Sequence, residues 1–274
     1  MSLPTVPHPP GCATASIPPP CNCARPMMST DNKSWARRLL VLQVFLLAVL
    51  VIAPLGHKAE LLPFAAAFLG ALLAMALVLI TGVLGFAMWL WAWAKKAPQL
   101  RLQAGCAAVI GVAPVLVAVV VVGPANFAVP PIHDISTDTE NPPQYVAAKR
   151  ERSPAENTLE YPGAEVARLQ RQAYPEVGPL LSELPVEAAF ERSLAVVEAL
   201  GWRLLEQEPG SGRIEAVEET AWFGFKDDII IRISAAGTGS RVDSRSVSRV
   251  GKSDLGANAA RILRFQRAFE AGVE

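Results

Sequence analysis

The sequence predicts an α-helical membrane anchor followed by a soluble α+β domain. Two observations support this fold class: three long stretches contain no charged residue, at residues 39–56, 61–94 and 104–123, and helix and strand periodicities are concentrated after Pro185. We therefore divide the chain into four parts. They are a disordered Pro-rich cytoplasmic tail (1–38), three transmembrane helices (39–123), a Pro-rich irregular segment of the soluble domain (124–184) and its α+β core (185–274).

The uncharged stretches have the lengths of membrane-spanning helices. The first and third would be about 27 and 30 Å long, which matches a hydrocarbon core of roughly 30 Å. The second stretch has 34 residues, and dividing it would leave about 17 residues for each span and none for a turn. We therefore predict one tilted helix, with spans at about 39–56, 63–90 and 104–123. Trp89, Trp91 and Trp93 at the end of the second span are typical of an interfacial aromatic belt.

Positive charges near the spans predict the orientation. Only Lys58 lies in the short loop after the first span, and no Lys or Arg occurs between Gly123 and Lys149. Under the positive-inside rule, we expect a multi-pass protein of the cytoplasmic (inner) membrane, with a cytoplasmic N-terminus and a periplasmic C-terminal domain. The side that carries the N-terminus and the loop between the second and third spans holds seven positive residues, namely Arg25, Lys33, Arg37, Arg38, Lys95, Lys96 and Arg101.

Charge and composition limit the classes of function. Residues 1–123 have a net charge of +6 and residues 124–274 a net charge of −6, and an acidic domain argues against nucleic acid as a partner. The spans contain no ionisable residue, which argues against proton pumping. Neither a Gly-rich phosphate loop, a haem motif nor a metal-ligand cluster occurs, so we expect no cofactor and no metal. The expected partners are the lipid bilayer and another envelope protein or an anionic small molecule.

The cysteines do not form a disulfide framework in the soluble domain. Cys12, Cys21 and Cys23 lie in the N-terminal tail, and Cys106 lies in the third span. The three tail cysteines lack a paired C-x-x-C, so we expect no zinc site there. Met27 or Met28 is an alternative start that would remove this tail and keep the first span.

Periodicities in the soluble domain predict an antiparallel four-stranded meander flanked by helices, arranged in two layers. A helix opens at Pro185 and stops at Gly201. A closing helix is capped by Ser253 or Asp254, and Leu255, Ile262, Phe265 and Phe269 form its apolar stripe. The Pro-rich segment has one short helical candidate, at 164–173. The four strands are expected at 202–207, 213–220, 228–235 and 241–250, with Gly-rich turns between the outer pairs.

Five stretches of the C-terminal half carry a resemblance to a known family. They are PIHDISTD (131–138), RIEA (213–216), FGFKDD (223–228), RSVSRVG (245–251) and SDLGANAAR (253–261). The chain resembles the uncharacterised family called domain of unknown function 1499, whose members occur as free-standing domains and behind membrane anchors. The resemblance implies a domain boundary and no particular activity, substrate or catalytic residue.

The last predicted strand carries the main candidate site. Alternation places Arg245 and Arg249 on one face, with Arg241 and Asp243, and four residues on the other, namely Val242, Ser244, Ser246 and Ser248. We favour a solvated face with cross-strand pairs to Asp228, Glu215 or Glu219. The alternative is an anion site, in which both arginines bind a carboxylate or phosphate near the helix that begins at Asp254.

Asn258 is an exception in the closing helix. At 100° per residue it falls inside the apolar stripe, with Asp254 and Arg261 on its flank. A buried amide needs hydrogen-bond partners. We expect Asn258 to bind carbonyl groups of the strap at residues 132–138, and the alternative is contact with a ligand, together with Ser246 and Arg261.

His133 and Asp134, with Ser136 nearby, are the candidate catalytic residues of a hydrolase-like enzyme. His133 is the only histidine of the soluble domain, but neighbours in sequence rarely align as nucleophile, base and orienting group. No G-x-S-x-G turn occurs. We therefore expect a membrane-anchored periplasmic binding or scaffold module without enzymatic activity, and keep the hydrolase-like envelope enzyme as the alternative.

Two further groups of residues have two interpretations each. The acidic set of Glu218, Glu219, Asp227 and Asp228 offers calcium ligands but lacks a suitable loop, so we favour solvated charges. Around Gly224, the aromatic residues Trp222, Phe223 and Phe225 belong either to the core or to an exposed lip that touches lipid or ligand.

The charge count makes a prediction about topology. A reporter that is active only in the periplasm should be active when it is fused after Glu274, and inactive when it is fused within the loop at 95–100, because the positive residues favour the cytoplasm. Reporter activity in whole cells measures both fusions. The reverse pattern would refute the orientation.

Overall fold

A computed structural model describes Met1 and residues 30–272 of the 274-residue chain. Its described residues contain seven α-helices and a six-stranded antiparallel sheet, so the predicted combination of three long apolar helices and an α+β domain is confirmed. Most of the predicted Pro-rich tail, with its three cysteines, lies outside the described residues. The first helix already begins at Thr30, inside the range assigned to the tail.

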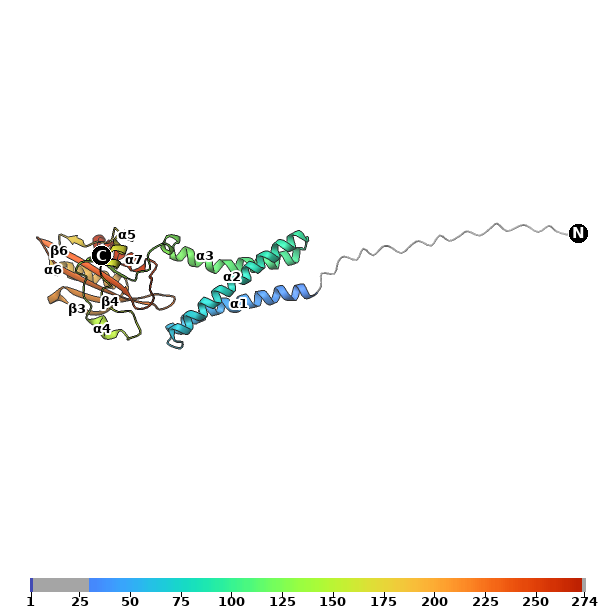
Figure 1. Ribbon diagram of the computed structural model, residues 1–274, viewed down its shortest axis with the longest axis horizontal. Helices are drawn as coiled ribbons and strands as arrows, with labels where there is room; N and C mark the ends of the chain where they lie inside the picture. The colour runs from blue at the N-terminus through green and yellow to red at the C-terminus, as the bar shows by residue number, and fades with distance from the viewer. Residues whose placement is uncertain (2–29, 273–274) are drawn as a thin grey trace.

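Three long helices form the N-terminal part: α1 (Thr30–Lys58), α2 (Phe64–Ala94) and α3 (Pro98–Val122). Each is long and apolar enough to cross a membrane. The second uncharged stretch forms one helix and not two, because α2 is a single helix of 31 residues. Figure 1 shows α1 and α3 beside α2, with the α+β domain beyond one end of the helices.

Small residues and one buried amide hold these helices together. A Cβ atom added to Gly111 of α3 would lie only 2.2 Å from the Cα of Gly82 in α2, so the two backbones touch at their crossing. Gln43 of α1 is fully buried and donates to Thr81 Oγ1 of α2 (3.2 Å) and to the carbonyl of Ala107 in α3 (2.8 Å). This side chain therefore connects all three helices.

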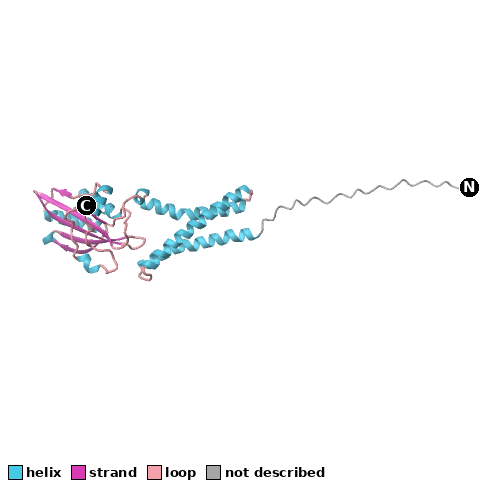
Figure 2. Cartoon of the chain, viewed as in Figure 1, coloured by secondary structure: helices cyan, strands magenta, loops and turns pink. Residues whose placement is uncertain are grey.

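The strands are β1 (Asp134–Ser136), β2 (Leu180–Ser182), β3 (Arg203–Glu208), β4 (Arg213–Glu219), β5 (Lys226–Ala236) and β6 (Gly239–Ser248). The order is β1-β6-β5-β4-β3, and β2 also pairs with β6. Strands β3 to β6 are the predicted meander. The sequence did not predict β1 and β2, because three residues are too few to show an alternation. Figure 2 shows the strands gathered in the C-terminal domain.

Two helices cover one face of this sheet: α6 (Val186–Ala199) and α7 (Ala257–Ala271). Phe190 of α6 and Phe265 of α7 pack with Ile229 and Ile231 of β5 in the largest apolar core. The prediction that α7 starts at Ser253 or Asp254 is wrong by a few residues, because positive φ angles at Leu255 and Gly256 interrupt the helix there. For the same reason Leu255 is not part of the buried stripe.

The other face of the sheet is covered by the Pro-rich segment, which contains α4 (Ala147–Glu151). The remaining elements are the predicted α5 (Ala164–Ala173) and two 3₁₀ turns, η1 (Pro124–Phe127) and η2 (Pro209–Ser211). Tyr145, Ala148 and Leu159 pack on Ile230 of β5 and Val247 of β6. The expected two-layer arrangement is therefore incomplete, since an irregular third layer buries the face that was expected to be solvated.

The third layer makes a prediction about folding. A chain that starts at Asn126 should be soluble and unfold cooperatively, because it contains the sheet and both of its covers. Urea unfolding followed by circular dichroism measures this. A chain that starts at Pro185 is the control and should not fold, because the face of the sheet around Arg245 would lack its cover. Equal cooperativity of the two chains would contradict this account.

Candidate functional site

Strand β6 positions the predicted site residues on two faces of the sheet. Arg245 and Asp243 point to the Pro-rich segment, and Ser246 and Ser248 point to α7, so the predicted alternation is confirmed. The interpretation as a solvated face is wrong: Arg245 is 0% exposed and Arg249 is 5% exposed. The reason is the third layer, which sequence periodicity does not reveal.

Arg245 lies at the centre of the buried face. Its Nε and Nη2 atoms donate to the two carboxylate oxygens of Asp134 in β1, at 2.9 and 2.7 Å. Nη1 donates to the carbonyl of Pro143 (3.1 Å), and Nη2 also donates to the carbonyl of Leu159 (3.0 Å). This guanidinium is therefore bound in a forked ion pair and holds two points of the irregular segment.

Two tyrosine rings enclose the same guanidinium. The Cζ of Arg245 lies 5.2 Å from the ring centre of Tyr145 and 5.3 Å from that of Tyr161. Burial raises the pKa of Tyr161 to about 12, and the Asp134 carboxylate adds to the rise. Burial also raises the pKa of Asp134, against the hydrogen bonds and charge of Arg245. Conversely, burial opposes the charge of Arg245, but pairing with Asp134 raises its pKa.

Arg249 belongs to a second ion cluster. The expected cross-strand pair forms, because Nη2 of Arg249 lies 2.7 Å from Oδ1 of the fully buried Asp228. Arg152 binds the other oxygen of Asp228 through its Nε (2.6 Å). Asp228 neutralises only one of these two arginines, and Glu151 lies 3.3 Å from Arg249 and supplies a second negative charge. Hydrogen bonds that Arg203 donates to Glu151 lower the pKa of this carboxyl to about 2, against a smaller effect of burial.

Glu215 of β4 has a role that the sequence did not indicate. Its fully buried carboxylate accepts hydrogen bonds from the backbone N–H groups of Val146, Ala147 and Ala148, at 2.8, 3.0 and 2.9 Å. These groups lie at the start of α4, where backbone donors favour an anion. Arg213 is its nearest positive partner, with Nε at 3.3 Å.

On the opposite face, the amide of Asn258 in α7 is fully used. Its oxygen accepts from Ser246 Oγ (2.7 Å) and from Arg261, and its nitrogen donates to Ser248 Oγ (2.9 Å) and to the carbonyl of His133 (3.0 Å). The expected bond to the strap is thereby confirmed. Each hydrogen-bonding group of this buried amide has a partner inside the protein.

The acidic set is paired with basic residues. Arg261 binds Asp227 and Glu218, and Glu218 also binds Arg264. The expectation of solvated charges is wrong for Asp227 and Asp228, which are 4% and 0% exposed, because both lie on β5 under a cover of arginines. Residues 30–272 contain no group of three or more side chains suited to hold a metal ion.

Asp254 and the α7 N-terminus form part of the same face. The Asp254 carboxylate accepts from the backbone N–H groups of Gly256 and Asn258, both at 2.9 Å. Burial raises the pKa of Asp254, and these hydrogen bonds act against the rise. The side chain therefore caps the start of α7 from two residues before its N-cap residue, Gly256.

The structure separates the candidate catalytic residues. Asp134 is held by Arg245, and Ser136 Oγ donates to the carbonyl of Asp138 (2.8 Å). The ring of His133 contacts the carbonyl of Lys252 at 3.4 Å. Among the described residues, these contacts do not join His133, Asp134 and Ser136 into a nucleophile, a base and an orienting group.

The aromatic residues of the β4–β5 loop meet the helical anchor. Trp222 is 56% exposed, whereas the rings of Phe223 and Phe225 stack on each other at 5.4 Å. Phe225 packs on Phe64 (5.5 Å) and Phe223 on Phe68 (6.0 Å), both in the first turns of α2. These residues therefore form an aromatic lip at the junction of the domain and α2, in which Phe223 and Phe225 contact the protein itself, so the structure matches neither a core position nor an exposed lip on lipid or ligand.

Several residues of the site were missed by sequence reasoning. Glu215 was detectable as a carboxylate flanked by the apolar residues Ile214 and Ala216 in β4. Gln170 of α5 is 1% exposed and binds both backbone groups of Ser136 at 2.7 and 3.0 Å. Tyr145 and Arg152 lie in irregular chain, where no periodicity indicates burial.

One comparison with known proteins bears on this domain. A family model described as "Protein of unknown function (DUF1499)" matches residues 134–269. The matched segment begins at Asp134, the partner of Arg245, and ends at Phe269 in the apolar core. No curated protein matches the chain.

The Arg245 contacts make a prediction about stability. Arg245→Gln should lower the free energy of unfolding by about 3–5 kcal/mol, because the buried Asp134 carboxylate would lose its counter-ion. Urea unfolding of the chain from Asn126 measures the change. Asp134→Asn combined with Arg245→Gln should cost less than the sum of the single changes. The exposed Arg150 is the control, and Arg150→Gln should leave stability nearly unchanged; an equally small loss for Arg245→Gln would contradict the structural role.

Proposed function

The chain belongs, through residues 134–269, to the DUF1499 family of proteins of unknown function, and we propose that it acts as a membrane-anchored periplasmic binding or scaffold module. Three apolar helices precede the family domain. The seven positive residues beside the N-terminus and the α2–α3 loop support an inner-membrane location with the domain in the periplasm.

The observation that carries this proposal is the contact between the β4–β5 loop and the start of α2. Phe223 and Phe225 pack on Phe68 and Phe64, and Lys58 at the end of α1 lies 3.9 Å from Glu219. These contacts come from the end of the anchor where α1 and α2 are joined. They support a domain that rests on the membrane surface in a defined orientation, with the exposed Trp222 in the interfacial region.

The interior of the domain supports a scaffold more than an enzyme. Arg245, Arg249 and Arg261 have carboxylate partners inside the protein, so they hold the layers of the domain together. A ligand at the hypothetical anion site would have to displace Asp134 or Asp228. A surface held rigidly at the membrane suits the binding of another envelope protein or an anionic small molecule.

A copurification experiment tests this proposal. The full chain, purified in nanodiscs from its own membranes, should carry a stoichiometric partner that mass spectrometry identifies as a protein or a small molecule. Phe223→Ser with Phe225→Ser should release the domain from α2 and reduce the bound partner, because both rings contact the anchor. Phe127→Ser is the matched control, since this exposed ring lies outside the aromatic contact, and it should retain the partner.

Enzymatic activity of the purified chain would contradict the proposed binding or scaffold function. Hydrolysis of ester or phosphoester substrates by the purified chain, abolished by His133→Ala with the fold intact, would favour the hydrolase-like alternative. Retention of the partner by the Phe223 and Phe225 variant would contradict a function that depends on the docked domain.

A further inference from the structure

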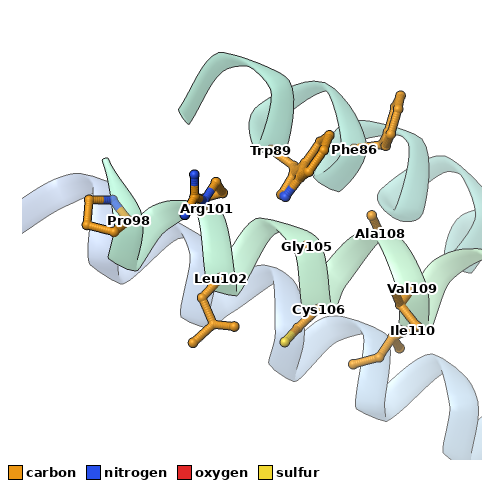
Figure 3. Close-up of a pocket in the computed structure, with 10 residues that line it drawn as sticks. All are labelled: Phe86, Trp89, Pro98, Arg101, Leu102, Gly105, Cys106, Ala108, Val109 and Ile110. Atoms are coloured by element: carbon orange, nitrogen blue, oxygen red, sulfur yellow. The ribbon is translucent and has the colours of Figure 1, made fainter. Parts of the chain in front are cut away.

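A groove lies between α2 and α3 near the loop that joins them. It consists of two adjoining cavities of about 730 and 530 Å³, which share Pro98 and Arg101 of α3. The larger one runs along Phe86 and Trp89 of α2, and the smaller one reaches Lys96. Figure 3 shows the two aromatic side chains of α2 beside the stretch of α3 that follows Arg101.

Glycine at position 105 allows Trp89 to form one wall of this groove. A Cβ atom at Gly105 would lie 3.2 Å from Cδ1 of Trp89, which is closer than an ordinary van der Waals contact. The indole therefore lies directly over the α3 backbone. Leu102 and Val109, one turn before and after, complete an apolar channel along the helix.

The two ends of the groove differ in chemistry. Arg101 and Lys96 lie at the end near the α2–α3 loop, next to Lys95, and no Asp or Glu occurs between Glu60 and Asp134. Beyond Arg101 the channel is lined by apolar and aromatic side chains. The exposed Trp91 and Trp93 are typical of the depth at which a membrane meets water.

We propose that this groove binds one anionic glycerophospholipid of the surrounding leaflet. The headgroup phosphate lies between Arg101 and Lys96, and an acyl chain follows the apolar channel past Leu102 and Val109. The positive end without a neighbouring carboxylate selects a lipid with net negative charge. The apolar channel, which opens to the hydrocarbon core, selects a lipid over a soluble phosphate compound.

Native mass spectrometry of the full, delipidated chain in a mild detergent tests the proposal. Phosphatidylglycerol should bind with a stoichiometry of one, and phosphatidylethanolamine, which has no net charge, should bind at least about tenfold more weakly. Inorganic phosphate should not bind measurably, because it lacks the acyl chain. Equal binding of the two lipids, or retention of phosphate alone, would overturn the proposed lipid site.

Variants separate this groove from general attraction to the membrane surface. Arg101→Gln with Lys96→Gln should weaken phosphatidylglycerol at least about tenfold. Arg37→Gln with Arg38→Gln is the matched control, since both are exposed basic residues that do not line the groove, and it should change the affinity less than about threefold. Equal losses in the two variants would reduce the effect to surface charge and overturn the site.

A third variant tests the channel itself. Gly105→Leu should displace the Trp89 indole, which forms one wall of the groove, and abolish phosphatidylglycerol binding, with circular dichroism used to check that the helices still form. Gly105→Ala adds a single methyl group and should give an intermediate loss. Unchanged affinity in a folded Gly105→Leu chain would show that the acyl chain lies elsewhere.

Discussion

The ion pair between Arg245 and Asp134 is the interaction on which the soluble domain depends. A fully buried guanidinium is tolerated only when its donors have partners and its charge is balanced. Asp134 supplies the charge, and the carbonyls of Pro143 and Leu159 supply further acceptors. These partners come from chain that has little regular structure. The pair therefore explains how a Pro-rich segment becomes an ordered layer on the sheet.

Strand β1 connects this layer to the opposite face. Asp134 faces Arg245 on one side of the sheet, whereas the carbonyl of the preceding residue, His133, accepts from Asn258 of α7 on the other. A strand of three residues is thus held by a side chain from each face. Buried polar contacts of this kind add little net stability compared with an apolar core, but wrong partners leave charges unpaired. Their value here is the selection of one arrangement of the layers.

The three long helices are also held together by buried polar contacts, but with fewer polar groups than the soluble domain. Gly82 and Gly111 bring two backbones into contact, and Gln43 supplies the hydrogen bonds that join the third helix. The aromatic lip of the β4–β5 loop then packs on α2. The domain and the long helices consequently meet through aromatic rings at the end where α1 and α2 are joined. The basic groove between α2 and α3 lies at the far end of α2.

Elements whose physical signal is local can be predicted from the amino-acid sequence. Uncharged stretches of span length predicted three helices, alternation predicted β3 to β6 and the two faces of β6, and the polar Asn258 in an apolar stripe predicted its bond to the strap. Tertiary structure alone decided that the arginine face is buried, that Asp134 belongs to Arg245 rather than to His133, and that β1 and β2 exist. The reason is the large separation along the sequence between the residues that make these contacts. Arg245 and Asp134 are 111 positions apart, and irregular chain that covers a sheet carries no periodicity from which its position can be read.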